Sequence, residues 1–186
     1  MNDRDRLRDL LVERSLKIGD FTLASGARST YYIDARRTTM SAEGQYLTGR
    51  VALDLIRAAG IRASHIGGLT MGADPVAYAI AHTSWISDVG LDAFSVRKEA
   101  KAHGTGQRIE GGLPEDAEVI AVEDSMTSGR SALEAVRAIE DHGCIVSAVL
   151  TLVDREEGGR EAVEAAGHPL LAVFTATELL EAASQV

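Results

Sequence analysis

The sequence predicts an α/β protein built on a mostly parallel sheet with helices on its faces. Two apolar runs, residues 119–122 and 145–153, are typical of strands buried on both faces. Strand patterns alternate with helix patterns, which favours right-handed crossovers between parallel strands. Polar clusters follow the expected strand ends, where such sheets bind ligands. They lie at 67–74, 97–103, 123–131 and 154–155.

Length and composition indicate one globular domain covering residues 1–186. Of the 186 residues, 45% are hydrophobic and 25% charged, which excludes disordered and collagen-like chains. The formal net charge of −9 argues against nucleic-acid binding, which depends on basic surface. No run approaches the ~18 apolar residues of a membrane span, and the charged N-terminus does not resemble a secretory signal. A single cysteine, Cys144, excludes an intrachain disulfide, so we expect a cytoplasmic protein.

The first half mixes helical and extended patterns. The spacing of one helix face is shared by Leu7, Leu10, Leu11 and Ile18. Ser41 is suited to cap a helix that continues to about residue 59. The other elements expected here are extended segments at 21–23 and 31–33, a strand at 65–66, a helix at 75–81 and a strand at 92–96.

Residues 98–114 predict a long exposed loop, since they hold four glycines, one proline and little apolar periodicity. Loops of this length are usually functional or disordered. This one carries Lys98 and Lys101, two of only three lysines in the chain, so we expect it to hold an anion. After the strand at 119–122, helices are expected at about 130–142 and 157–166, strands at 145–153 and 170–174, and a closing helix.

The segment 119–131 carries the strongest chemical signal. A buried strand is followed by Glu123 and Asp124, then by a small polar turn that opens a helix. The turn offers hydroxyls and unpaired backbone N–H groups, which suit a phosphate. An ordinary capped turn with two solvated acids is the alternative, but two adjacent acids directly after a buried strand favour a ligand site. The Walker pattern does not fit, because no Gly-Lys-Ser/Thr is present.

Val-Ile-Ala-Val-Glu-Asp-Ser-Met-Thr-Ser-Gly-Arg-Ser, at 119–131, resembles the phosphoribosyl diphosphate (PRPP) motif of type I phosphoribosyltransferases. Four further stretches resemble the orotate phosphoribosyltransferase branch, and Arg-Lys-x-x-Lys-x-His at 97–103 is the most specific of them. The others are 21–26 with 31–36, 67–75, and 153–159. The resemblance implies the type I fold, with a mostly parallel central sheet flanked by helices. It also implies a small hood, from residues about 1–40 and the C-terminal segment, and a flexible catalytic loop at about 98–114.

The resemblance implies that the 5-phosphoribosyl group is transferred from PRPP to orotate, giving orotidine 5′-monophosphate and diphosphate in de novo pyrimidine (UMP) biosynthesis. The implied cofactor is Mg²⁺, carried by PRPP and supported by Glu123 and Asp124 without a direct protein ligand. The residues implied to bind PRPP are Arg97, Lys98, Lys101, His103, Glu123, Asp124, Ser125, Met126, Thr127, Ser128, Gly129, Arg130 and Ser131.

Catalytic roles are implied for Arg97, Lys98, Lys101, His103 and Asp124. Cations on a closing loop would stabilise the departing diphosphate and exclude water, and His103 would assist its protonation. Orotate-binding roles are implied for Thr127, Arg155, Tyr31 and Tyr32, and an arginine fork suits a carboxylate. The alternatives are a structural Asp154–Arg155 pair and, for one of the two tyrosines, plain core packing.

Many members of the family carry lysines where this chain has Ala24 and Gly72, which places more of the leaving-group stabilisation on the 97–103 loop. The resemblance also implies a homodimer whose loop reaches the partner's active site, with no nucleic-acid or membrane partner. Two other functions stay open, a purine phosphoribosyltransferase and a regulator of this fold that binds PRPP without catalysis. The loop and Asp154-Arg155 argue against the first. Retention of the loop, without a basic extension, argues against the second.

Overall fold

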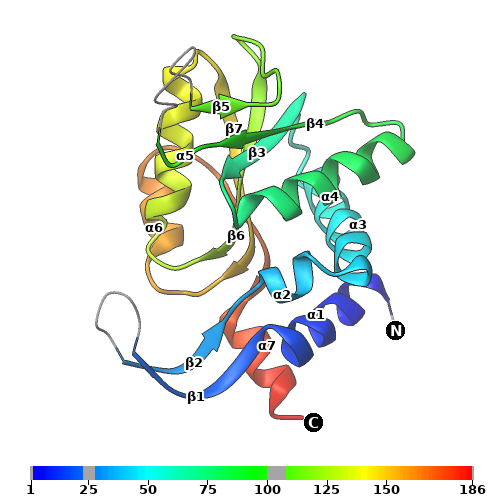
Figure 1. Cartoon of the computed structure of the whole chain (residues 1–186), viewed down its shortest axis with the longest axis vertical. Helices are drawn as coiled ribbons and strands as arrows, with labels where there is room; N and C mark the ends of the chain where they lie inside the picture. The colour runs from blue at the N-terminus through cyan, green and yellow to red at the C-terminus, as the bar shows by residue number, and fades with distance from the viewer. Residues whose placement is uncertain (1, 23–27, 100–107, 186) are drawn as a thin grey trace.

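The computed structural model describes residues 2–22, 28–99 and 108–185 (Figure 1). The central sheet and its helices form one lobe, and α1, α7, β1 and β2, here called the hood, lie together at its lower end. The described elements are α1 (Asp3–Arg14), β1 (Leu16–Thr22), β2 (Arg28–Ile33), α2 (Arg36–Thr39), α3 (Ala42–Ala58), β3 (His65–Leu69), α4 (Ala73–Ile86), β4 (Asp92–Val96), β5 (Ile109–Glu110), β6 (Glu118–Met126), α5 (Arg130–Asp141), β7 (Ile145–Asp154), α6 (Gly159–Ala165), β8 (Leu170–Thr175) and α7 (Ala176–Ala183).

The central sheet has the strand order β5-β4-β3-β6-β7-β8. Strands β4, β3, β6, β7 and β8 pair in parallel, and only the short β5 runs antiparallel to its neighbour β4. The mostly parallel sheet predicted from the sequence is therefore confirmed. Parallel pairing brings the carboxyl ends of β3, β6 and β7 to one edge, where the polar clusters follow them.

Two hydrophobic cores lie on opposite faces of this sheet. On β6, Ile120 and Val122 belong to the core that α1, α3 and α4 cover, whereas Val119 and Ala121 belong to the core under α5 and α6. All four are at most 2% exposed, so the strand is apolar on both faces, as its sequence indicated. Burial on both faces stabilises the position of β6, because apolar surface removed from water contributes ~25 cal/mol per Å².

Several element boundaries differ from the predictions. Ser41 caps α3 as expected, and its side chain accepts a hydrogen bond from the N–H of Gly44. The placement of Ile18 on the first helix was wrong, because α1 ends at Arg14 and Ile18 lies exposed on β1. The expected loop at 98–114 is interrupted by β5, which is anchored by the buried Ile109; residues 100–107 lie outside the described part of the chain.

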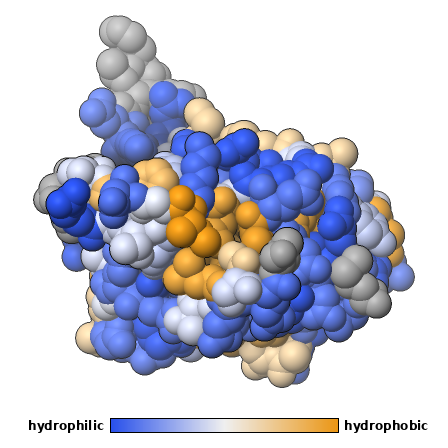
Figure 2. Space-filling model, turned by 90° about the horizontal axis from the view of Figure 1, so that it is seen from below, coloured by the Kyte–Doolittle hydropathy of each residue, from blue (hydrophilic) through white to orange (hydrophobic). Residues whose placement is uncertain are grey.

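The face of the molecule at the hood end is mostly hydrophilic (Figure 2). Figure 2, seen from the end where the hood lies, shows one patch of hydrophobic residues near the centre of a hydrophilic face. None of the described helices is both long and apolar enough to cross a membrane.

Candidate active site

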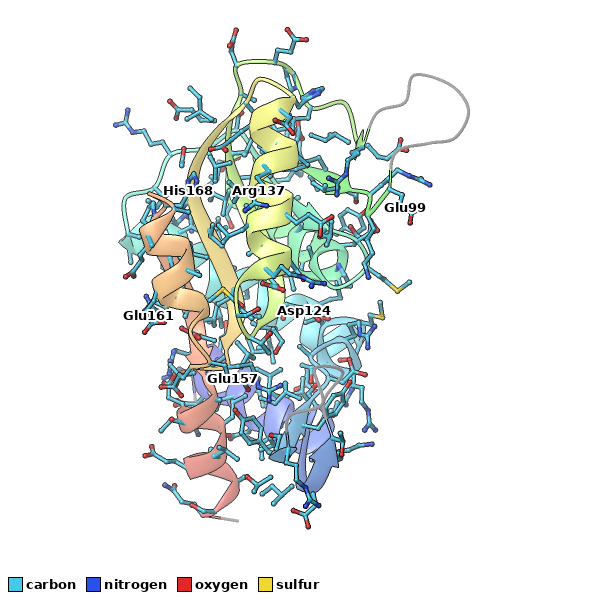
Figure 3. The ribbon with its side chains drawn as sticks, turned by 90° about the vertical axis from the view of Figure 1, so that its left-hand side faces the viewer. Glu99, Asp124, Arg137, Glu157, Glu161 and His168 are labelled. Atoms are coloured by element: carbon cyan, nitrogen blue, oxygen red, sulfur yellow. The ribbon has the colours of Figure 1, made fainter. Side chains whose placement is uncertain are left out.

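A cavity of about 620 Å³ lies where β3, β6 and β7 end, between the central sheet and the hood. Figure 3 shows two of its residues, Asp124 and Glu157, at the level between the sheet and the hood. Of the residues predicted from the sequence, the cavity is lined by Tyr32, Lys98, Glu123, Asp124, Ser125, Thr127, Ser131 and Arg155. The structure thus brings together side chains that lie up to 123 positions apart, between Tyr32 and Arg155.

The two acids stand within β6 rather than after it, which corrects the predicted end of this strand at Val122. The backbone continues to pair with β7 through Glu123, Ser125 and Met126. Polar side chains do not interrupt the ladder, because they leave the backbone N–H and C=O groups free to bond across it. The side chain of Met126 is fully buried in the core under α5 and α6, so it does not reach the cavity.

The turn between β6 and α5 closes the cavity on one side. Gly129 has a φ of +73°, a backbone region that favours glycine, and directly precedes the first residue of α5. Thr127 and Ser131, on either side of this turn, line the cavity together with Ser125. Three further residues with predicted PRPP roles, Ser128, Gly129 and Arg130, are not among those lining the cavity.

Burial controls the protonation of the two adjacent acids. Burial, followed by the neighbouring charge of Asp124, raises the pKa of Glu123 to about 7, although hydrogen bonds from the first turn of α5 oppose the shift. Burial also raises the pKa of Asp124. The Oε2 atom of Glu123 is buried and has no hydrogen-bond partner among the described residues. A ligand hydroxyl that donates to these carboxylates would therefore stabilise their charged forms.

Arg155 places a buried cation on the opposite side of the cavity. Its side chain is 4% exposed, its guanidinium carbon lies 4.5 Å from the centre of the Tyr31 ring, and its Nε donates to the Tyr31 hydroxyl at 3.3 Å. Its Nη2 lies 2.9 Å from Glu157 Oε1 in an ion pair, yet it has no hydrogen-bond acceptor among the described residues. The alternative Asp154–Arg155 pair was wrong, because Asp154 pairs with Arg160 instead.

The two tyrosines of β2 lie in different surroundings. Tyr32 is 38% exposed and lines the cavity. Tyr31 packs against the core that α1 and α3 share, and beneath the Arg155 guanidinium. Alternate residues of a strand point to opposite faces, which explains why only one of them reaches the cavity.

A family model described as the phosphoribosyl transferase domain matches residues 45–166. The orotate phosphoribosyltransferase of Aquifex aeolicus is 45% identical over 183 residues, covering 97% of this chain and 99% of that protein. The chain belongs to the orotate phosphoribosyltransferase family. The solved Mycobacterium tuberculosis orotate phosphoribosyltransferase superposes with a TM-score of 0.85 at 43% identity, covering 96% of this chain and 99% of that one. The type I phosphoribosyltransferase fold is thereby confirmed.

A second structure of the Mycobacterium tuberculosis orotate phosphoribosyltransferase, in complex with PRPP, has a TM-score of 0.81 at 40% identity and covers 96% of this chain and 99% of its own. The adenine phosphoribosyltransferase of Leishmania donovani is 14% identical with a TM-score of 0.66, covering 98% of this chain and 85% of its own. That likeness shows the shared fold alone.

The predicted catalytic loop of this orotate phosphoribosyltransferase family member is described only at its base. Lys98 lines the cavity, and Arg97 lies with it in an adjoining groove of about 660 Å³. The backbone N–H of Arg97 donates to the carbonyl of Arg108 at 2.7 Å, so the two strands of the loop base are paired. Lys101 and His103 lie outside the described residues, as does Ala24, the first of the two family lysine positions.

Sequence reasoning assigned no role to several residues that line the cavity. Arg36 and Asp34, which follow β2, form an ion pair at 2.9 Å, and the charge of Arg36 also opposes the raised pKa of Asp124. Gly72 lies so close to Asp124 that a Cβ there would stand 2.3 Å from the carboxylate oxygen Oδ1. These residues lie within the stretches 31–36 and 67–75, which carried the family resemblance. The resemblance was therefore the sequence signal that could have identified them.

Proposed function

We propose that the chain transfers the 5-phosphoribosyl group from PRPP to orotate in pyrimidine biosynthesis, releasing diphosphate. One observation carries the proposal: a single cavity joins a phosphate-type turn and two partly buried acids to a buried arginine, whose Nη2 pairs with Glu157 but makes no hydrogen bond among the described residues. A sugar phosphate and a carboxylate-bearing base are complementary to those two ends.

The PRPP end is formed by β6 and α5. Hydroxyls of Ser125, Thr127 and Ser131, with the N-terminus of the 12-residue helix α5, suit the 5′-phosphate. Glu123 and Asp124 suit the ribose hydroxyls, because burial makes their charges costly until a donor arrives. The unpartnered Oε2 of Glu123 is an acceptor available for this purpose.

Magnesium fits this end of the cavity, since its preferred ligands are carboxylate and phosphate oxygens. Glu123 and Asp124 would support it through PRPP rather than hold it alone. Among the described residues, no three His, Cys, Asp or Glu side chains gather into a metal-binding cluster. When bound, the ion would neutralise charge on the diphosphate.

The orotate end is formed by Arg155 and Tyr32. The Arg155 guanidinium is held in one orientation by the Tyr31 ring and hydroxyl, so it is prepared for a planar carboxylate. Tyr32 would form a wall of the base site, and Thr127 lies in the same cavity. This arrangement orients the base nitrogen toward the anomeric carbon, which is catalysis by positioning.

The loop at 97–103 is proposed to stabilise the leaving diphosphate through Arg97, Lys98, Lys101 and His103. Replacing Lys101 with alanine is expected to lower kcat ~100-fold and to change the KM for orotate little, because the charge develops only as diphosphate departs. Steady-state kinetics at varied orotate measure both constants. An unchanged kcat would contradict the role in leaving-group stabilisation.

One assay separates this function from the two alternatives. Protein, PRPP and Mg²⁺ are mixed with orotate, and the loss of orotate absorbance is followed. Turnover with hypoxanthine or adenine, but none with orotate, would indicate a purine enzyme. Binding of PRPP without turnover on any base would indicate a regulator.

A homodimer is proposed, with the exposed face of α4 as its interface. Tyr78, His82, Trp85 and Ile86 share one helix face, and Trp85 and Ile86 are 78% and 69% exposed. The Tyr78 hydroxyl lies 2.8 Å from Ser95 Oγ, in the groove that also holds Arg97 and Lys98. A second copy seated on α4 would therefore stand beside the catalytic loop.

The oligomeric state tests this interface. Trp85→Asp is expected to give a monomer in light scattering, whereas Ile145→Asp, at another exposed apolar position, is expected to leave a dimer. A dimer in both variants would exclude this face. A single domain covering residues 1–186 and a cytoplasmic location also remain proposals.

A further inference from the structure

Glu156 has an uncommon backbone conformation beside the base end of the cavity. It lies between Arg155 and Glu157 in the turn that joins β7 to α6, and its φ is +57°. Few residues with a side chain adopt this left-handed region, and such residues gather at functional sites. The turn must therefore be held in this conformation by contacts outside it.

The carboxylate of Glu156 supplies such a contact. Its Oε2 accepts hydrogen bonds from the backbone N–H of Thr177 at 2.9 Å and from the Thr177 hydroxyl at 2.6 Å. Thr177 is the second residue of α7, so its N–H has no partner within the helix. A negative charge at a helix N-terminus is also favourable.

Helix α7 does not depend on Glu156 for its own cap. Thr175 and Glu178 already form a reciprocal capping box at its N-terminus. The Glu156–Thr177 contact is therefore an additional tie between the turn and the hood. We infer that its main effect falls on the turn rather than on the helix.

The rest of the turn is fixed to the sheet. The backbone N–H of Glu156 donates to Asp154 Oδ1 at 2.9 Å, and the buried Asp154 also pairs with Arg160 at 3.4 Å. On the other side, the N–H of Arg155 donates to the carbonyl of Met126 at 2.8 Å. The backbone of Arg155 is therefore anchored to β6, and the next residue, Glu156, is anchored to α7.

We propose that Glu156 is a positioning residue for the base. Its contact with Thr177 holds the turn so that the Arg155 guanidinium faces the cavity beside Tyr31. This inference rests on the proposed role of Arg155 toward the carboxylate of orotate. Glu156 does not line the cavity, so its effect on orotate binding is indirect and acts through the turn.

Steady-state kinetics of four variants test the proposal. Glu156→Ala is expected to raise the KM for orotate about five-fold, because an ordered turn loses its charge-assisted contact, with kcat and the KM for PRPP nearly unchanged. Glu156→Gly accepts the positive φ but lacks the carboxylate, so it is expected to show the same defect. Glu156→Gln keeps an acceptor and is expected to recover part of the affinity. Thr177→Val removes one donor and should give a smaller rise.

Asp116 offers a matched control. It is exposed, has a φ of +62°, and precedes β6 at the opposite edge of the sheet. Asp116→Ala should therefore leave the KM for orotate unchanged. If Glu156→Ala lowers only the melting temperature, or if Glu156→Gly restores orotate affinity, the positioning role is excluded.

A double variant distinguishes failure of this inference from failure of the proposed function. In an Arg155→Ala background, Glu156→Ala should raise the KM for orotate no further, since both act through one guanidinium. If Arg155→Ala alone leaves orotate affinity unchanged, the proposed base site is wrong. If Arg155→Ala weakens orotate binding and Glu156→Ala does not, only the positioning role is wrong.

Discussion

Two neighbouring strand–helix connections of the same sheet form the two ends of the cavity, and the side chains that they place there differ in charge. One joins β6 to α5 and the other joins β7 to α6, after strands that pair in parallel. Each turn has a left-handed glycine directly before its helix, Gly129 at φ +73° and Gly158 at φ +89°. The β6 side presents Glu123 and Asp124, whereas the β7 side presents Arg155 together with Glu157.

The difference lies in how each charge is balanced before a ligand arrives. Glu123 is partly buried, its buried Oε2 has no hydrogen-bond partner among the described residues, and its pKa is raised to about 7. Arg155 is buried, yet Glu157 stands 2.9 Å from its Nη2 and Tyr31 supports its plane. The same strand–turn–helix arrangement therefore forms both ends of the cavity. The β6 end requires hydrogen-bond donors from a ligand, whereas the β7 end already has a counter-charge in Glu157.

The largest expected effect comes from removing the cation. Arg155→Ala should raise the KM for orotate about 1,000-fold, because a buried charge pair loses one partner and leaves the substrate carboxylate unpaired. Arg155→Lys should recover only part of this affinity, since a lysine lacks the planar fork. The KM for PRPP, measured in the same rate assay, should change little if the two ends act separately. An unaltered orotate affinity would count against the contact.

At the acidic end of the cavity we expect a smaller effect, which appears in the free energy of unfolding. A pKa raised from 4.5 to about 7 means that Glu123 favours the folded state fully below pH 4.5 and loses this contribution as pH rises through 7. Glu123→Gln removes the titration. Its unfolding free energy relative to the parent should therefore grow between pH 5 and pH 8, by on the order of 3 kcal/mol.

Urea unfolding at constant protein concentration, at pH 5, 6, 7 and 8, measures this difference. Burial raises the pKa of Asp124 in both proteins, so this contribution cancels in the comparison. A stability difference that stays constant with pH would show that Glu123 is not protonated when the cavity is empty.

Much of the cavity could be predicted from local sequence because parallel pairing fixes where strands end. The apolar runs at 119–122 and 145–153 identified β6 and β7, and the residues after them are those that meet at one edge. The resemblance then supplied roles for Glu123 and Arg155. Glu123 and Arg155 share one cavity because the parallel register of β6 and β7 places the ends of these strands side by side. A sequence pattern can indicate this arrangement without coordinates.

Other features depended on contacts that no local pattern records. Asp154 and Arg155 are adjacent in sequence, which suggested a pair, but successive side chains of an extended chain point in opposite directions. The left-handed Glu156 turns the chain back and brings Glu157 to Arg155 instead. The ion pair of Asp34 with Arg36 lies just after β2 and lines the cavity, although it is far along the chain from Asp124.

The smallest expected effect concerns the internal counter-charge. Glu157→Gln should lower the KM for orotate about three-fold, because the carboxylate competes with the substrate for Arg155 and repels it; the effect is small since Glu157 is 36% exposed. Added salt should shrink the difference by screening this charge. Glu161→Gln, on the exposed surface of α6, is the matched control and should leave the KM unchanged. A higher KM in Glu157→Gln would reverse the comparison between the two turns, because Glu157 would then hold Arg155 in place for the substrate.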